Sequence, residues 1–153
     1  MNNQNELYAY CAGLFDGEGW FRINRIPGHY SRMKNKWAFQ CEASIQMREK
    51  NIIELFLQNF GGTVREYKPK NKNHSITYKW RCSGPTAQNF AQTILPWLRG
   101  KTKHAKLLIE FQEQKNLNGN QPISSQRYCF YKKCFTTFSA LNKKGIGKTL
   151  TTK

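Results

Sequence analysis

Acidic residues are scarce in this chain of 153 residues, and they are unevenly distributed. Nine Asp and Glu stand against 25 Lys and Arg, so the formal net charge is +16. Residues 114–153 carry eight Lys and Arg and no acid. An imbalance of this size favours a polyanionic partner such as nucleic acid.

Long hydrophobic runs are also lacking. The sequence has no stretch of the roughly 18 apolar residues that a transmembrane helix needs. Its opening, MNNQNELYAY, has no basic n-region of the kind that begins a signal peptide. We therefore expect no membrane partner and an intracellular location, either in the cytoplasm of a bacterium or in an organelle such as a chloroplast or mitochondrion.

Paired cysteine motifs are absent as well. The five cysteines are odd in number and form no C-x-x-C pair, which argues against a zinc site. Most of them fall at apolar positions, so we interpret them as reduced core residues: Cys11, Cys41, Cys82, Cys129 and Cys134.

The beginning of the chain lacks positive charge. Residues 1–19 contain three acids and no Lys or Arg. The segment 7–15 has neither charge nor proline and predicts a helix. Ala9 and Gly13 lie four residues apart on one face of this helix, with Ala12 beside them, a spacing that lets another helix approach closely.

That helix is expected to end in the segment Asp16-Gly17-Glu18-Gly19, where the two glycines can adopt positive φ. Carboxylates at the C-terminus of a helix oppose its dipole. One interpretation is a glycine cap with two solvated acids. The other is a divalent cation, bound by hard oxygen ligands, that offsets the repulsion. The spacing leaves both interpretations open.

The remaining patterns predict an α+β fold in the order αββαββα. Residues alternate between polar and apolar in four predicted strands, at 20–26, 39–46, 64–68 and 75–82. Helical patterns lie between the second and third strands, at 51–60, and after the fourth strand, at 83–95, 103–116 and 125–141. A linker is expected at 117–123 and a basic tail from about 143 to 153. We expect a single domain over residues 1–153, in which helices cover one face of a four-stranded antiparallel saddle.

The other face of that sheet is expected to be bare and to present eleven polar side chains with one acid among them. Arg, Gln and Asn are the side chains that read guanine and adenine edges in the major groove, so this face predicts DNA binding, although a plain solvated face is the alternative. Its members are Arg22, Asn24, Gln40, Glu42, Ser44, Gln46, Arg65, Tyr67, Thr77, Lys79 and Arg81. Basic residues at the hairpin tips are expected on phosphates: Arg32, Lys34, Lys36, Lys70 and Lys72.

Residues 11–19, Cys-Ala-Gly-Leu-Phe-Asp-Gly-Glu-Gly, resemble the LAGLIDADG motif of homing endonucleases. They differ by Cys for the first Leu, Phe for Ile, Gly for the second Ala and Glu for the second Asp. The resemblance implies that Glu18, with the carbonyl of Gly19, binds the catalytic divalent metal. Asp16 is then the more structural acid. It also implies that the sheet sits as a saddle on the DNA major groove.

Two further positions take catalytic roles by the same resemblance. Residues 96–105 are similar to the segment that brings the active-site lysine of the family, which is Lys101 here. Glu49 falls where the family places a Gln or Glu that organises solvent near the metal. Without the resemblance, Lys101 is equally a solvated lysine at a helix start, and Glu49 an acid favoured by a helix N-terminus.

One expected residue is missing from this set. The family often has an arginine four residues after the position of Glu49, and Ile53 stands there. Arg48 and Lys50 are the candidates to replace it.

The motif occurs once, which in this family implies a homodimer of the single-motif (I-CreI-like) branch. The expected interface comprises Ala9, Ala12, Gly13 and Asp16, and a two-fold axis would bury this face isologously. Residues 140–144 and the basic tail, with Lys143 and Lys144, resemble the part of that branch that contacts the DNA backbone.

The resemblance thus implies a Mg²⁺-dependent, site-specific endonuclease of the intron-homing type, acting on a long pseudo-palindromic double-stranded DNA. Mn²⁺ is expected to replace Mg²⁺, and Ca²⁺ to bind without turnover. Two alternatives stay open: an RNA maturase that assists intron splicing, and a non-catalytic DNA-binding regulator of the same fold. A ribosomal-type RNA binder fits the charge but does not explain the acid-Gly-acid-Gly segment.

Overall fold

The computed structural model describes residues 3–27 and 38–143. Its elements confirm the predicted order αββαββα, and a 3₁₀-helix and two long helices follow. In chain order they are α1 (Asn3–Glu18), β1 (Gly19–Ile26), β2 (Ala38–Met47), α2 (Lys50–Phe60), β3 (Thr63–Tyr67), β4 (Thr77–Ser83), α3 (Gly84–Ile94), η2 (Leu95–Trp97), α4 (Thr102–Asn118) and α5 (Ser125–Asn142).

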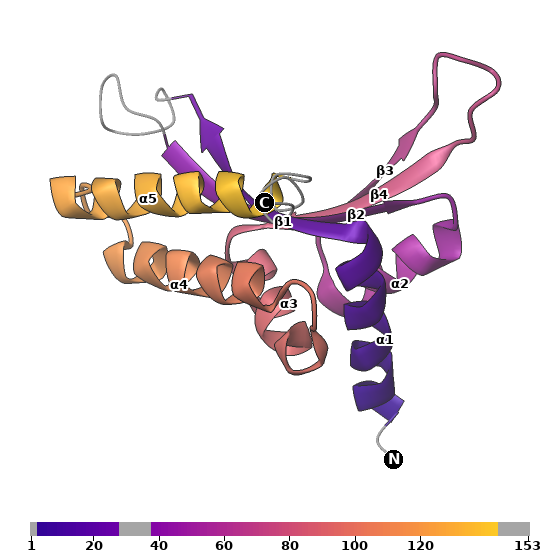
Figure 1. Cartoon of the computed structure of the whole chain (residues 1–153), viewed down its shortest axis with the longest axis horizontal. Coiled ribbons are helices and arrows are strands. Elements are labelled where there is room, and N and C mark those ends of the chain that lie inside the picture. Colours follow the sequence, from indigo (N-terminus) through magenta and orange to yellow (C-terminus); the bar gives the residue numbers. More distant parts are fainter. Residues whose placement is uncertain (1–2, 28–37, 144–153) are drawn as a thin grey trace, which may run out of the picture.

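The four strands form one antiparallel sheet in the order β1-β2-β4-β3. Arg22 on β1 lies opposite Glu42 on β2, and Ser44 on β2 lies opposite Arg81 on β4. Figure 1 shows the sheet curving upward at both ends, with α1 to α4 below it. The face without these helices is therefore concave, as expected for a saddle.

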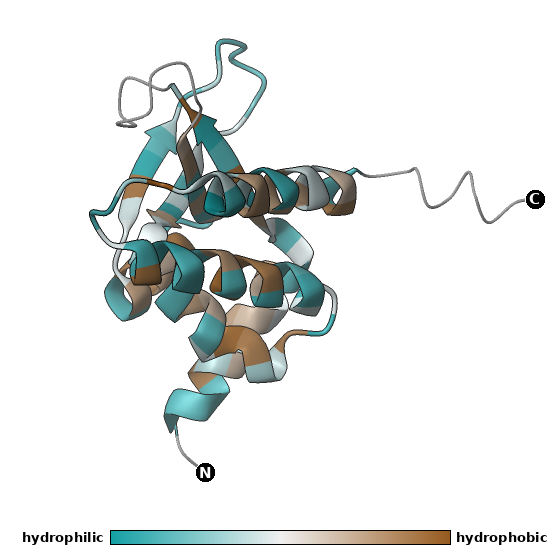
Figure 2. Ribbon diagram, turned by 90° about the vertical axis from the view of Figure 1, so that its left-hand side faces the viewer, coloured by the Kyte–Doolittle hydropathy of each residue, from teal (hydrophilic) through white to brown (hydrophobic). Residues whose placement is uncertain are grey.

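Alternation along the strands separates a buried face from a polar one. On β1, Phe21 and Ile23 are buried against the helices, whereas Arg22 and Asn24 lie on the opposite face. Trp80 on β4 is fully buried, and its Nε1 donates to the carbonyl of Gly61 at 2.7 Å. Figure 2 shows the corresponding pattern on the ribbon, with hydrophobic segments where the helices pack and hydrophilic ones toward the outside.

The end of α1 differs from the prediction. The helix runs through Gly17 to Glu18, Gly19 begins β1, and neither glycine has a positive φ. Gly19 is needed for a different reason, since a Cβ there would lie 2.4 Å from Cδ2 of Phe15. Close packing of β1 on α1, rather than a left-handed turn, therefore demands this glycine.

Element boundaries differ elsewhere by a few residues. β4 begins at Thr77 rather than at residue 75, and α4 continues to Asn118 through the first part of the expected linker. In α2 the fully buried side chains are Ile53 and Phe56, while Ile52 and Leu55 are only partly buried. Ile53 thus belongs to the core.

The cysteines are free thiols, and four of the five are buried, Cys129 being exposed. This agrees with the interpretation of most of them as reduced core residues. None of the helices in the described ranges is long and apolar enough to cross a membrane.

Candidate active site and nucleic-acid interface

Asp16 ties the end of α1 to the loop that leads into α4. Its Oδ2 accepts a hydrogen bond from the backbone N of Arg99 at 2.7 Å, and its Oδ1 accepts one from the N of Lys101 at 2.9 Å. Its carbonyl oxygen accepts a hydrogen bond from Nζ of Lys101. The carboxylate expected at the dimer interface is therefore engaged within its own chain, where it positions the lysine segment.

These contacts bring Glu18 and Lys101 to the same place. The ammonium of Lys101 lies at the negative C-terminal end of α1, where a cation is favoured. Glu18 is exposed and follows Asp16 by two residues. Both line one hollow, called the inner hollow below, together with Asp16, Gly17, Gly19, Trp20, Arg22, Gly100, His104, Leu141 and Asn142.

Glu18 also lines a second hollow, called the outer hollow, with Gln46, Met47, Arg48, Glu49 and Thr77. Glu49 occupies the N-cap position of α2, where its carbonyl accepts from the N of Ile52 at 3.2 Å. Its side chain makes no capping hydrogen bond. Glu18 and Glu49 thus line one hollow from two different elements.

The two candidates for the missing arginine occupy different surroundings. Arg48 lines the outer hollow. Lys50 instead pairs with Glu54 at 3.6 Å, and its Nζ lies 5.8 Å from the centre of the Tyr78 ring. Arg48 thus shares a hollow with Glu18 and Glu49, whereas Lys50 is paired with Glu54.

Sequence reasoning gives no individual role to His104 or Asn142, which both line the inner hollow, although Asn142 falls within residues 140–144, which resemble a DNA-contacting part of the family. His104 follows Lys101 by three residues on α4, a helical spacing that was the available signal. Asn142, at the end of α5, donates from Nδ2 to the carbonyl of Phe21 at 3.0 Å, so α5 closes back onto β1. No local pattern in the sequence indicates that contact.

The surroundings of His104 lower the pKa of its imidazole. Burial lowers its pKa, the charge of Lys101 lowers it further, and a backbone hydrogen bond at Leu141 partly opposes both. In the described part of the chain, its Nδ1 is buried without a hydrogen-bond partner. These surroundings favour the neutral imidazole.

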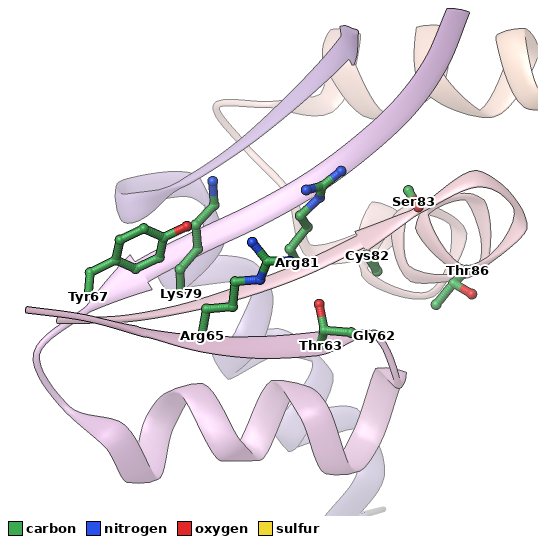
Figure 3. Close-up of a pocket in the computed structure, with 9 residues that line it drawn as sticks. All are labelled: Gly62, Thr63, Arg65, Tyr67, Lys79, Arg81, Cys82, Ser83 and Thr86. Carbon is green, nitrogen blue, oxygen red and sulfur yellow. The ribbon is translucent and has the colours of Figure 1, made fainter. Parts of the chain in front are cut away.

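The polar sheet face carries the expected basic residues. Figure 3 shows Arg65, Tyr67, Lys79 and Arg81 projecting from β3 and β4 around one pocket. Nζ of Lys79 lies 5.0 Å from the centre of the Trp20 ring. Burial is the main cause that lowers the pKa of Lys79; the Glu42 carboxylate raises it, and the charges of Arg22, Arg81 and Arg65 lower it further.

Glu42 and Ser44 are the exceptions on this face, since the sequence places both among the exposed base-reading side chains but both are fully buried. The side chain of Glu42 has no exposed surface. Arg22 and Arg81 cover the Glu42 carboxylate from the two neighbouring strands. Nη2 of Arg22 lies 2.7 Å from Oε1, and Nε of Arg81 lies 2.8 Å from Oε2. The alternation of β2 put Glu42 on the correct face but did not reveal that two long side chains would bury it.

Other expected contact residues are distributed as follows. Gln46 donates to Oγ1 of Thr77 at 2.7 Å, which joins β2 to β4 on the polar face. Lys70 in the β3–β4 loop and Lys143 after α5 are exposed. Four further residues lie outside the described residues: Arg32, Lys34, Lys36 and Lys144.

The residues on the exposed face of α1 differ from those expected for helix packing. Ala12 is fully buried in its own chain, so its side chain is not on the surface. Ala9 is half-buried and Gly13 is exposed. A Cβ added at Gly13 or at Gly17 would meet nothing within 4 Å. Ala9, Gly13 and Gly17 are spaced by four residues, and they, rather than Ala12, mark the open face.

Comparisons with known proteins agree with the family resemblance of residues 11–19. A family model described as LAGLIDADG endonuclease matches residues 11–132. Among solved structures, the chain resembles the archaeal intron-encoded homing endonuclease I-Vdi141I in complex with DNA. The TM-score is 0.74 and the identity 16%, over 94% of this chain and 88% of that one.

Two further solved structures share the fold. The homing endonuclease I-CvuI, in complex with the I-CreI target in the presence of Mg, matches with a TM-score of 0.58 and 16% identity, over 89% of this chain and 96% of that one. The group I intron-encoded homing endonuclease I-CeuI, complexed with DNA, matches with a TM-score of 0.63 and 15% identity. That match covers 93% of this chain and 68% of the other.

Proposed function

The chain belongs to the LAGLIDADG endonuclease family, and we propose from this and from the site geometry that it is a site-specific double-stranded DNA endonuclease. In this proposal residues 1–153 form one endonuclease domain of the single-motif, homodimeric branch. It hydrolyses phosphodiester bonds with a divalent metal, on a long pseudo-palindromic site of the intron-homing type.

The observation that carries the proposal is the meeting of three elements around the end of α1. Glu18 ends α1, Glu49 precedes α2 and Lys101 precedes α4, and the hollows that they line share Glu18. Arg22 lines the inner hollow and also belongs to the basic sheet face. A backbone bound on that face would therefore pass directly over the carboxylates.

The donor set suits a hard divalent cation. Glu18 supplies carboxylate oxygens, and the Gly19 carbonyl is a further oxygen ligand, which is the chemistry that Mg²⁺ prefers. Bound there, Mg²⁺ would stabilise charge on the phosphate oxygens and lower the pKa of a bound water. We expect Mn²⁺ to replace it and Ca²⁺ to bind without turnover.

The protein side chains have separate tasks in this proposal. Lys101, held by the carbonyl of Asp16, places a fixed positive charge where the scissile phosphate gains negative charge. Glu49 and Gln46 face the outer hollow and orient water there by hydrogen bonds. Arg48 adds a cation at the same hollow.

Two protomers are needed to place two such sites at one cut. The open face at Ala9, Gly13 and Gly17 allows the α1 helices of two protomers to approach closely. Because Glu18 ends the same helix, a two-fold axis along α1 would bring the two Glu18 side chains near each other, one for each DNA strand.

The test is in vitro selection of cleaved duplexes from a randomised palindromic library, with Mg²⁺ and separately with Ca²⁺. Mg²⁺-dependent double-strand cuts at one enriched two-fold site are expected. Enrichment of bound but uncut DNA under both metals would replace the endonuclease by a DNA-binding regulator. No enrichment of DNA would contradict both and direct the search to an RNA partner, as for a maturase.

A further inference from the structure

A fully buried carboxylate lies at the centre of the polar sheet face. The side chain of Glu42 is 0% exposed, whereas those of Arg22 and Arg81 are 40% and 45% exposed. Removing a charge from water is costly, so such a group persists only when it is well paired and hydrogen-bonded. Two half-exposed guanidinium groups thus rest on a buried anion.

The acceptor capacity of Glu42 is used up by these neighbours. Oε1 accepts from Nε and Nη2 of Arg22, at 3.1 Å and 2.7 Å, and from Oγ of Ser44 at 2.8 Å. Oε2 accepts from Nδ2 of Asn24 at 2.9 Å, and it forms an ion pair with Arg81, whose Nε lies 2.8 Å away. A carboxylate offers about four lone-pair sites. None is left for the amino group of a cytosine, which is the base edge that an acid reads.

The sheet topology makes Glu42 a link between two strands. Arg22 reaches it from β1, directly across the β1–β2 pair, and Arg81 reaches it from β4 on the other side of β2. One carboxylate therefore sets the orientation of two arginines on strands that are not neighbours. A guanidinium has five N–H donors, so both arginines keep donors beyond those that Glu42 binds.

We propose that Glu42 is a positioning residue for sequence recognition, which holds Arg22 and Arg81 ready to read bases and restrains them from reaching phosphates. The inference rests on the proposed DNA-binding function. An arginine that is already ordered loses less side-chain entropy when it binds. The carboxylate also partly offsets the positive charge that Arg22, Arg81 and Arg65 place around Lys79.

Base preference and salt dependence of binding test this role. Sites would be selected by binding in Ca²⁺ for the wild type and for Glu42→Gln, and the bases read by each arginine would be located with Arg22→Gln and Arg81→Gln. At those bases Glu42→Gln should lower discrimination about tenfold, the scale of one good arginine–guanine contact. Its affinity should also depend more steeply on salt, since the released arginines would reach phosphates.

Glu66→Gln is the matched control. It makes the same change of net charge, but among the described residues Glu66, on β3, pairs with Lys68 at 3.5 Å and forms no ion pair with Arg22 or Arg81. Its base preference should equal that of the wild type. If Glu42→Gln lowers only the melting temperature and keeps the full base preference, Glu42 is a structural residue and the positioning role is overturned.

A second comparison removes Arg22 first, so that the charge of the buried Glu42 carboxylate is balanced by one arginine, Arg81. Arg22→Gln keeps Glu42 bound to Arg81, Asn24 and Ser44, so the preference at the base read by Arg81 should persist. The double variant Arg22→Gln/Glu42→Gln should lose it, and equal preference in the two variants would contradict the proposal. If the wild type enriches no DNA sequence, the proposed function itself fails. If it does, these variants judge Glu42 alone.

Discussion

At the scale of single residues, Glu18 is placed where its charge is disfavoured by its own helix. It is the last residue of α1, the last turn of that helix has no basic residue, and the dipole there is negative. Its carboxylate is exposed and lines both hollows. A bound cation would turn this repulsion into attraction, which is the physical basis for proposing Glu18 as the metal ligand.

Glu18→Gln should therefore abolish cleavage while DNA binding persists. The amide keeps the size of the side chain but removes the charge that attracts the metal, so cleavage should fall at least about a thousandfold. Cleavage would be measured in Mg²⁺, and binding by mobility shift in Ca²⁺. Glu6→Gln, in the first turn of the same helix, is the control, and it should cut normally. Full cleavage by Glu18→Gln would contradict the assignment.

His104 should make stability depend on pH. Its pKa is lowered in the folded protein, so the unfolded chain binds more protons as the pH falls through the ordinary histidine pKa of about 6.5. The contribution of His104 to the free energy of unfolding should be fully present above that pH, and it should be lost as the pH falls below it. Urea unfolding without metal at pH 7.5 and pH 5.5 measures the decline.

The control for that measurement is a second histidine. His104→Gln should decline less between the two pH values than the wild type, while His74→Gln, in the exposed β3–β4 loop, should behave like the wild type. Identical pH dependence of the wild type and His104→Gln would show that His104 is not responsible.

At the scale of elements, the junction of α1 and β1 decides how the motif packs. Phe15 is fully buried and packs on Phe21 and Phe90, with ring centres 4.6 Å and 4.9 Å away. Gly19 presses its backbone against the Phe15 ring. The first strand can leave the helix directly only because this position has no side chain.

Gly19→Ala should lower the free energy of unfolding, whereas Gly17→Ala should leave it unchanged or raise it. A Cβ at Gly19 would lie 2.4 Å from the Phe15 ring, which cannot move in the core, so overpacking should cost about 1–3 kcal/mol. Gly17 is helical and its Cβ would meet nothing within 4 Å, so alanine there should be neutral or stabilise by up to about 1 kcal/mol. Urea unfolding of both variants makes the comparison, and equal stability would refute the packing argument.

At the scale of the whole molecule, the concave basic face and the open face of α1 serve different partners. The first carries Arg22 on β1 and Lys79 and Arg81 on β4, and a net charge of +16 adds long-range attraction for a polyanion. The second carries Gly13 and Gly17 and is proposed to meet a second copy. In the proposed function, cleavage of both DNA strands needs the two faces together.

Gly13→Leu should separate folding from dimer formation. The leucine has open space in the single chain, so the melting temperature of the protomer should change little. Between two closely packed α1 helices it would clash, and sedimentation should show a monomer with little double-strand cleavage. Ser139→Leu, an exposed helical position on α5, is the control. A dimer that survives Gly13→Leu would contradict the proposed interface.

Local patterns in the sequence determined the elements and the side of each strand. Alternation separated Phe21 and Ile23 from Arg22 and Asn24, because a strand's side chains point alternately to its two faces. Helical periodicity located α2 to α5 to within a few residues. The motif at residues 11–19 indicated the family, which a family model over residues 11–132 then showed.

The tertiary structure alone decided which side chains meet and which are buried. Glu42 is on the predicted face yet hidden by Arg22 and Arg81, and Ala12 is in the core rather than on the open face. Asp16 holds the backbone of Lys101, 85 residues away in the chain. Burial and hydrogen-bond partners are set by elements brought together from distant parts of the chain, and a local pattern carries no information about those distances.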